Sequence, residues 1–183
     1  MRASADPIVA VSQRLESFVA DQVIAGAATG PEGALFVDAA AAALTGGKRL
    51  RARFCVMGWR AVAERLSGAP ADAGDDVTAA AAALEVFHAA ALVHDDLIDN
   101  SDTRRGRPAA HRALEQDHRT AGWSGDAAAF GRSAALLLGD LLVAWSDDLL
   151  EEGLTVAAHA ASARRLYGQM RRDVTIGQFL DIA

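Results

Sequence analysis

Residues 94–108 of this chain contain four aspartates and three arginines. Asp95 and Asp99 are four residues apart, so on a helix they lie on one face, and Asp96 is adjacent. Two like charges about 4 Å apart repel by roughly 4 kcal/mol at an effective dielectric near 20, so such carboxylates are kept together most readily by cations. A few hard carboxylate oxygens that leave room for water and phosphate suit Mg²⁺. The arginines that follow carry planar forks that match phosphate oxygens, so the block predicts a diphosphate site.

The alternative interpretation of this block is a solvated acidic helix end followed by a basic turn. An apolar run at residues 89–93 leads directly into the carboxylates. Such a run argues against simple exposure, because apolar residues of a helix are the ones most often buried.

The block resembles the first aspartate-rich motif of trans-isoprenyl diphosphate synthases, the polyprenyl synthetase family. In that motif Asp-Asp-x-x-Asp is followed by Arg-Arg-Gly. The resemblance implies that Asp95, Asp96 and Asp99 hold Mg²⁺, for which Mn²⁺ could substitute. It also implies that Arg104 faces an allylic prenyl diphosphate and that Arg105 faces isopentenyl diphosphate. Weaker matches, taken as supports of the loop, are Asp102, Arg107 and His111.

A second basic motif, Gly-Gly-Lys-Arg-Leu-Arg, occupies residues 46–51 and contains the only lysine of the chain. Its glycines permit a tight turn between helices, and Lys48 and Arg51 would then share one face at the start of the next helix. Two fixed cations beside backbone N–H groups form a phosphate cradle. The motif resembles one with which the family binds isopentenyl diphosphate, although Ala52 stands where family members often have proline. A helix stop with a basic cap is the simpler alternative.

His88 precedes Asp95 by two helical turns, which places both on nearly the same face. A lone histidine on an apolar helix is commonly a core residue, but this register matches the family histidine that contacts isopentenyl diphosphate. Near the end of the chain, residues 177–181 resemble the family's Gly-Gln-x-x-Asp motif. The resemblance implies that Gln178 and Asp181 line the site near the allylic substrate; an ordinary polar helix face is the alternative. We also expect Asp140, in a further family signature, to be buried with polar partners.

Alanine-rich apolar segments of helical length predict an all-α protein. The resemblance specifies the fold as the isoprenoid synthase helical bundle around a central cavity, of which residues 1–183 would be the N-terminal portion as a single domain. The segment 111–125 is expected to be loop-like with at most one short helix. The helices are expected at 8–23, 32–44, 50–66, 77–99 and 127–150, and from 155 or 162 to 183.

The formal net charge of −6 argues against a general nucleic-acid binder. A single cysteine, Cys55, suits a reducing cytosol, and we expect a cytoplasmic protein without a signal peptide or transmembrane segment. The family resemblance also implies a homodimer.

The resemblance implies a prenyltransferase that condenses isopentenyl diphosphate with an allylic diphosphate by Mg²⁺-assisted ionisation. The growing tail should run beside the helix that precedes Asp95. Ala90 and Ala91 are small at the position where members with short products often have an aromatic residue, and Phe87 is about 12 Å from Asp95 along a helix. We therefore expect a geranylgeranyl (C20) product or a longer one, with Phe87, Ala90 and Ala91 in the chain-length pocket.

The family pattern includes a later Lys-Thr segment and a second Asp-Asp-x-x-Asp, and neither occurs in this sequence. A leaving diphosphate needs charge neutralisation from both sides, so we expect the 183-residue chain alone to be inactive. Two alternatives are a non-catalytic subunit of a heteromeric prenyl synthase and a class I terpene cyclase. The motif at 46–51 argues against the cyclase, because a cyclase binds no isopentenyl diphosphate.

Overall fold

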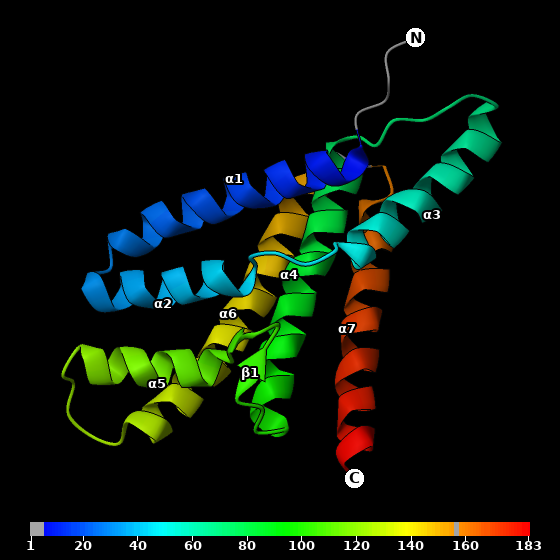
Figure 1. The fold of residues 1–183 in the computed structure, drawn as a ribbon. Coiled ribbons are helices and arrows are strands. Elements are labelled where there is room, and N and C mark those ends of the chain that lie inside the picture. The colour runs from blue at the N-terminus through cyan, green and yellow to red at the C-terminus, as the bar shows by residue number, and fades with distance from the viewer. Residues whose placement is uncertain (1–5, 156–157) are drawn as a thin grey trace.

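The computed structural model describes residues 6–155 and 158–183. Within these ranges the chain is almost entirely helical, which confirms the all-α prediction (Figure 1). One two-stranded hairpin interrupts the helices. The elements in chain order are α1 (Pro7–Ala27), α2 (Pro31–Ala43), α3 (Leu50–Ser67), α4 (Asp75–Ile98), β1 (Thr103–Arg104), β2 (Arg107–Pro108), α5 (Ala110–Thr120), α6 (Ala127–Leu154) and α7 (Ala160–Ile182).

Helix α4 is the centre of the bundle, and it packs most extensively along α6. Small residues allow this close approach: a Cβ on Gly139 would collide with His94, and a Cβ on Gly153 would collide with Ala79. Helices α1 and α2 form a hairpin beside this pair, and α5 lies against α6 (Figure 1). Phe18 of α1 meets Trp145 of α6 edge to face, with ring centroids 6.0 Å apart. Most of the core lies between α4, α6 and the α1–α2 hairpin, and Ala52 and Val56 of α3 and Tyr167 of α7 also belong to it.

The hairpin and the length of α5 were not expected from the sequence. The two-residue turn of the hairpin consists of Arg105 and Gly106, with φ values of 53° and 76°. Positive φ at both central residues is the type I′ geometry that matches the twist of paired strands. Helix α5 occupies Ala110–Thr120, so this part of the 111–125 segment is regular rather than loop-like. Helix α6 continues past residue 150 to Leu154.

By length and composition, α4 and α6 are each apolar enough to cross a membrane. In the most apolar window of α4, 61% of the residues are buried inside the protein, whereas the figure for α6 is 28%. The apolar character of α4 is thus accounted for by the core. Helix α6 leaves Leu136 and Leu137 more than half exposed.

Helix α7 runs alongside α4 in the same direction (Figure 1). Tyr167 is the residue of α7 that is buried, and most of the large apolar side chains of this helix are exposed. Among the described residues, α7 is therefore attached to the bundle through few contacts. A pocket lies between α3, α4 and α7.

Candidate active site

Two neighbouring carboxylates at the end of α4 are bridged by one arginine. The Asp96 side chain is buried and accepts a hydrogen bond of 2.9 Å from Nε of Arg104. A terminal nitrogen of the same guanidinium forms an ion pair with Asp96 and lies 3.2 Å from Oδ2 of Asp95. The hydrogen bond with Asp96 raises the pKa of Arg104 above its ordinary value, so this arginine is a permanent cation. The structure thus brings together three of the residues predicted from the first motif.

Asp99 is placed differently from its two neighbours. It is the C-cap of α4, its backbone N–H donates to the carbonyl of Asp95, and its side chain is exposed. No group of three His, Cys, Asp or Glu side chains within residues 6–155 and 158–183 is arranged to hold a metal ion. The three aspartates predicted as ligands therefore do not converge on one point in this structure.

The chemistry of Asp95 and Asp96 nevertheless fits Mg²⁺. This ion is bound through one or two carboxylates while it keeps several waters and takes the oxygens of substrate phosphates. Asp95 is about one third exposed, and it lines the pocket between α3, α4 and α7. A diphosphate entering that pocket would approach Asp95 from the open side.

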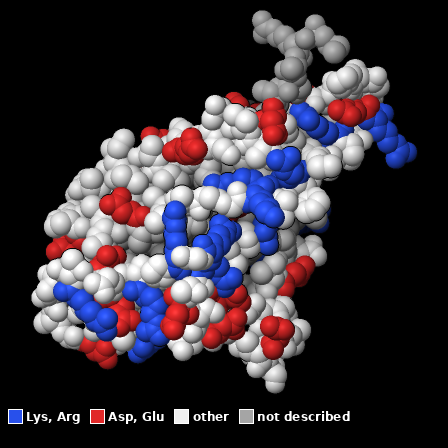
Figure 2. Space-filling view, in the orientation of Figure 1, with Lys and Arg blue, Asp and Glu red and all other residues white. Residues whose placement is uncertain are grey.

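The second basic motif lies directly across from the hairpin. Gly46 and Gly47 have φ values of 77° and 93°, conformations that other residues rarely adopt. A Cβ on Gly47 would lie only 3.1 Å from the guanidinium of Arg105, so the missing side chain makes room for this arginine. Lys48 is exposed and lies in the loop before α3 rather than in its first turn, whereas Arg51 lies within the helix. Basic side chains gather in the middle of the face shown in Figure 2, with acidic ones beside them.

Glu85 of α4 fixes the start of α3, a role that our sequence reasoning missed. Its buried carboxylate accepts a hydrogen bond of 2.9 Å from the backbone N–H of Ala52, in the first turn of α3. Its other oxygen lies 3.9 Å from Arg49, whose φ of 49° is left-handed. A carboxylate at a helix N-terminus satisfies an unpaired N–H and complements the helix dipole. The sequence signal that could have revealed this role is an acidic residue that closely follows a run of alanines.

His88 lies near the arginines of two segments, the start of α3 and the β1–β2 hairpin. Burial, and after it the positive charges of Arg51, Arg105 and Arg104, together lower its pKa to about 4. The imidazole is therefore neutral at pH 7. A neutral imidazole can donate one N–H to a phosphate oxygen without adding charge. The predicted isopentenyl diphosphate contacts Arg51, His88 and Arg105 are thus close in space.

The pocket beside these residues has a volume of about 510 Å³ and a lining of both polar and apolar residues. Gln178 of α7 donates a hydrogen bond of 3.3 Å to Asp95 and is part of the lining, whereas Asp181 is exposed and is not. Ala91 and Phe87 line the pocket, but Ala90 is fully buried in the core and does not. The polar lining is Arg51, His88, Asp95 and Gln178; the remaining lining is Phe54, Cys55, Leu84, Phe87, Ala91, Leu92, Met170 and Val174.

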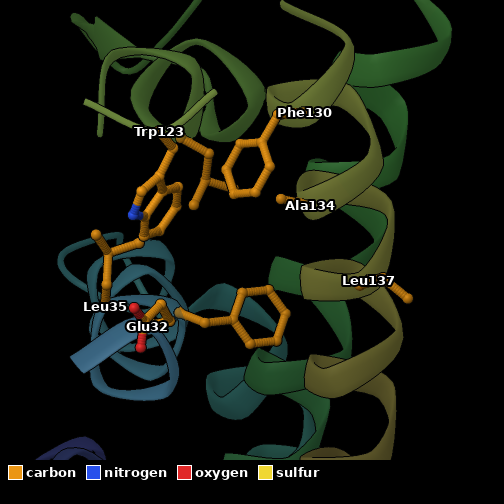
Figure 3. Close-up of a pocket in the computed structure, with 8 residues that line it drawn as sticks. Glu32, Leu35, Trp123, Phe130, Ala134 and Leu137 are labelled. Atoms are coloured by element: carbon orange, nitrogen blue, oxygen red, sulfur yellow. The ribbon is translucent and has the colours of Figure 1, made fainter. Parts of the chain in front are cut away.

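A second hollow of about 370 Å³ lies between α2, α5 and α6 (Figure 3). Its lining is aromatic and aliphatic, including Trp123, Phe130 and Leu137, and its one charged residue is Glu32. None of the described residues that line it is a cation that could hold a phosphate. The pocket at Asp95 is therefore the better candidate for an active site.

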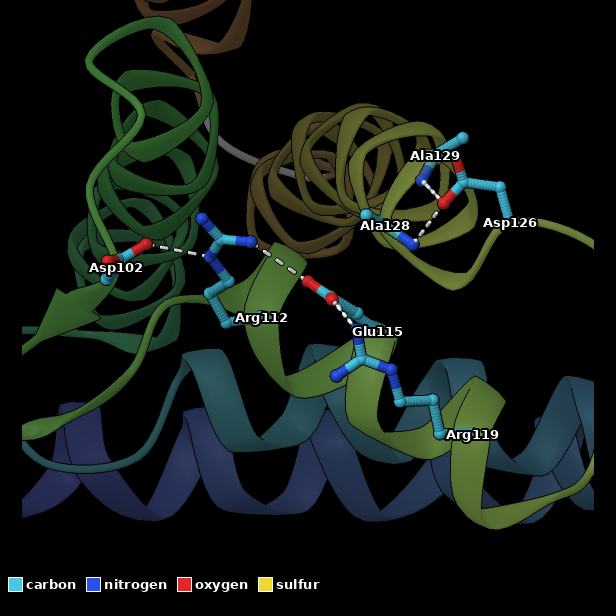
Figure 4. A network of polar contacts seen from close by, with 7 residues as sticks. All are labelled: Asp102, Arg112, Glu115, Arg119, Asp126, Ala128 and Ala129. Carbon is cyan, nitrogen blue, oxygen red and sulfur yellow. Dashed lines mark hydrogen bonds and ion pairs between the residues drawn. The ribbon is translucent and has the colours of Figure 1, made fainter.

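An ion-pair network supports the hairpin that carries Arg104 and Arg105 (Figure 4). Arg112 of α5 donates to Asp102 just before β1 at 2.7 Å, and to Glu115 at 3.0 Å. The buried Glu115 also pairs with Arg119. His111 is buried with neither ring nitrogen hydrogen-bonded to the described residues, and burial lowers its pKa. Asp102 thus has the supporting place expected for it.

The prediction that Asp140 is buried is wrong. Its side chain is 64% exposed, because it lies on the outer face of α6. Its carboxylate is 3.5 Å from Nε2 of His94, which also lies 3.2 Å from the carbonyl of Leu136. Asp140 therefore has a polar partner without being part of the core.

Fold and site together define a helical protein in which paired carboxylates and converging arginines flank a largely apolar pocket. The chain matches the sequence profile of the family described as "Polyprenyl synthetase" over residues 34–183. It belongs to the polyprenyl synthetase family, as the sequence motifs predicted.

Individual relatives agree with this assignment. The chain is 38% identical to a putative chloroplastic geranylgeranyl pyrophosphate synthase of Arabidopsis thaliana over 105 residues, which cover 55% of this chain and 22% of that protein. It is also 38% identical to the geranylgeranyl diphosphate synthase of Mycobacterium tuberculosis over 117 residues, covering 63% of this chain and 29% of the relative. The chain therefore spans less than a third of the length of these two relatives.

Solved structures show the same fold. The geranylgeranyl pyrophosphate synthase of Corynebacterium glutamicum, solved as a complex with isoprenyl diphosphate and magnesium, superposes with a TM-score of 0.86 and 38% identity. The match covers 96% of this chain and 49% of that protein. Farnesyl diphosphate synthase of T. brucei, at 19% identity and a TM-score of 0.73, supports the fold alone.

Proposed function

We propose that this chain supplies the isopentenyl-binding face and one metal-binding wall of a prenyltransferase that condenses isopentenyl diphosphate with an allylic prenyl diphosphate. The observation that carries the proposal is the convergence of Arg51, Arg104 and Arg105 around the neutral His88. Beside them lie Asp95 and a pocket whose remaining lining is mostly apolar. Cations for diphosphate next to an apolar channel are what a prenyl diphosphate requires.

Each group has a role in this proposal. Lys48, Arg51, His88 and Arg105 bind isopentenyl diphosphate. Arg104 and Gln178 face the allylic diphosphate, with Asp181 near the entrance. Mg²⁺, or Mn²⁺ in its place, is held by Asp95 and Asp96 with Asp99 nearby, and when bound it neutralises negative charge on the departing diphosphate.

The proposed product is geranylgeranyl diphosphate or a longer chain. Ala91 presents only a methyl group to the pocket, so the tail can pass it, and Phe87 lies one turn further from Asp95. We also propose that the 183-residue chain alone binds its substrates without turning them over, because it contains a single Asp-Asp-x-x-Asp.

Calorimetric titration of isopentenyl diphosphate into the chain tests the binding proposal. We expect binding that weakens about tenfold or more in Arg51→Ala, because a charge-assisted contact contributes about 1.5–3 kcal/mol. Arg65→Ala, at the far end of the same helix, is the matched control and should bind as the wild type does. Absence of binding to the wild type, or an equal loss in both variants, would contradict the proposal.

An assay of product formation from isopentenyl and farnesyl diphosphates with Mg²⁺ tests the proposal that the chain alone does not turn its substrates over. We expect none from this chain alone. Turnover at an ordinary enzymatic rate would overturn the expectation of inactivity and would support the prenyltransferase itself.

We further propose a homodimer. Leu136 and Leu137 of α6 are both more than half exposed, and neighbouring exposed apolar side chains are typical of contact surfaces. Analytical ultracentrifugation of the wild type and of Leu137→Arg tests this. A dimer that Leu137→Arg dissociates is expected, and a monomeric wild type would contradict it.

A further inference from the structure

Tyr167 attaches α7 to the bundle at the apolar end of the pocket. Its hydroxyl donates a hydrogen bond of 3.1 Å to the carbonyl of Ala83 on α4. Its ring meets that of Phe87 edge to face, with centroids 6.3 Å apart and planes at 65°. The guanidinium of Arg171 lies 5.4 Å from the centroid of the Tyr167 ring. Burial raises the pKa of Tyr167 to about 12, so the hydroxyl remains a donor.

The second attachment of α7 to α4 lies at the polar end of the same pocket. There Gln178 donates to Asp95. The two attachment points are eleven residues apart on α7 and twelve on α4, or about 17 and 18 Å at 1.5 Å per residue. The two helices therefore run side by side between these points, as Figure 1 shows. Met170 and Val174, which lie between them on α7, line the pocket.

Phe87 belongs to the pocket lining, whereas Tyr167 lies behind it. An edge-to-face aromatic pair is attractive beyond its buried area, so the Tyr167 ring restricts the positions that Phe87 can adopt. The hydrogen bond to Ala83 in turn fixes the Tyr167 ring. The part of the pocket wall that Phe87 forms is thus supported from behind by an aromatic ring of α7.

We propose that Tyr167 is a specificity-determining residue, which holds Phe87 across the apolar end of the pocket and so limits the length of the prenyl tail that fits. The inference rests on the proposed function, because it takes the ligand to be a prenyl diphosphate. Tyr167 acts through Phe87 and is not itself in contact with the tail.

Two ion pairs also join α7 to α6 and do not involve Tyr167. Arg164 of α7 pairs with Glu151 of α6, with Nε 2.7 Å from a carboxylate oxygen. Arg171 lies 2.5 Å from Asp147, also on α6. A change at Tyr167 therefore tests the end of the pocket more than the attachment of the whole helix.

The experiment is a series of calorimetric titrations of the 183-residue chain with geranyl, farnesyl, geranylgeranyl and geranylfarnesyl diphosphates in the presence of Mg²⁺. The wild type should bind progressively longer tails up to a limit, beyond which the affinity falls. In Tyr167→Ala we expect this limit to move up by at least one isoprene unit, with the affinity ratio of the longest to the shortest tail rising about tenfold. Tyr167→Phe keeps the ring and should keep the limit.

The controls separate specificity from stability. Leu166→Ala, at an exposed neighbouring position, should leave the length profile unchanged. Equal weakening of all tail lengths in Tyr167→Ala would mean that Tyr167 only anchors α7, and it would overturn the inference. If Tyr167→Ala is unfolded by circular dichroism, Tyr167→Leu and Phe87→Leu replace it; a shifted limit in Phe87→Leu but not in Tyr167→Leu would also overturn it. If the wild type binds none of the four ligands, it is the proposed function that fails.

Discussion

Ala52→Pro tests how the basic loop is positioned. The family resemblance makes proline the expected residue at this position, and proline is tolerated in the first turn of a helix. In this chain, however, the N–H of Ala52 donates to the buried carboxylate of Glu85. Proline has no N–H, so the substitution removes that bond and leaves Glu85 with Arg49 as its remaining partner.

The expected change in the free energy of unfolding follows from two opposing effects. A hydrogen bond to a charged group contributes about 1.5–3 kcal/mol. Proline also restricts the unfolded chain. Where the native backbone can adopt the φ of proline, this stabilises the folded state by about 0.4–1 kcal/mol. The free energy of unfolding should therefore fall by about 1–2 kcal/mol, which corresponds to a decrease in Tm of roughly 2–8 °C for a chain of this size.

Urea denaturation followed by circular dichroism measures this change. Ala127→Pro is the matched control, because Ala127 is the first residue of α6 and the cap Asp126 accepts from Ala128 and Ala129 instead. That control should be neutral or slightly stabilising. In a Glu85→Gln background, Ala52→Pro should lower the free energy of unfolding by distinctly less than it does in the wild type. A variant Ala52→Pro that is as stable as the wild type would refute the capping role of Glu85.

Two further predictions concern the surroundings of the site. The lowered pKa of His88, about 4 against 6.5 in the unfolded chain, means that the folded state binds fewer protons between these values. The contribution of His88 to the free energy of unfolding is therefore fully present above about pH 6.5 and is lost as the pH falls toward 4. An NMR titration of the His88 ring should have its midpoint near pH 4, and Arg51→Ala should raise it; a wild-type midpoint at or above 6.5 would contradict the convergence of cations. In the hairpin support, Glu115→Gln should destabilise by about 1–3 kcal/mol because Glu115 is buried between two arginines, and Asp102→Asn by less than about 1 kcal/mol because Asp102 is exposed. Hydrogen exchange of residues 103–108 should accelerate more in Glu115→Gln, and equal effects of the two substitutions would refute the proposed ranking.

The parts of the site that are encoded locally could be predicted from the sequence. Asp95 and Asp96 are adjacent at the end of an apolar helix, and Arg104 follows after a short connection. Helical spacing likewise placed His88 on the face of Asp95. These predictions needed only the helical period and the chemistry of the side chains.

The parts that depend on tertiary packing could not be predicted. The contact between Glu85 and Ala52 joins residues 33 positions apart. Ala90 and Ala91 differ by about 100° around α4, and only the packing of neighbouring helices decides which of them faces the pocket. The hairpin was missed because its I′ turn places Arg105 at a positive φ, where Asn, Asp or Gly is usual.

The central claim is that Asp95 and Asp96 bind an allylic diphosphate through Mg²⁺. The most direct test is calorimetric titration of farnesyl diphosphate with and without Mg²⁺, for the wild type, Asp95→Asn and the remote control Asp38→Asn. We predict that Mg²⁺ raises the affinity by about tenfold or more, or 1.4 kcal/mol, in the wild type and in Asp38→Asn, and by less than about twofold in Asp95→Asn. An affinity that does not depend on Mg²⁺, or an equal dependence in all three proteins, would contradict the claim.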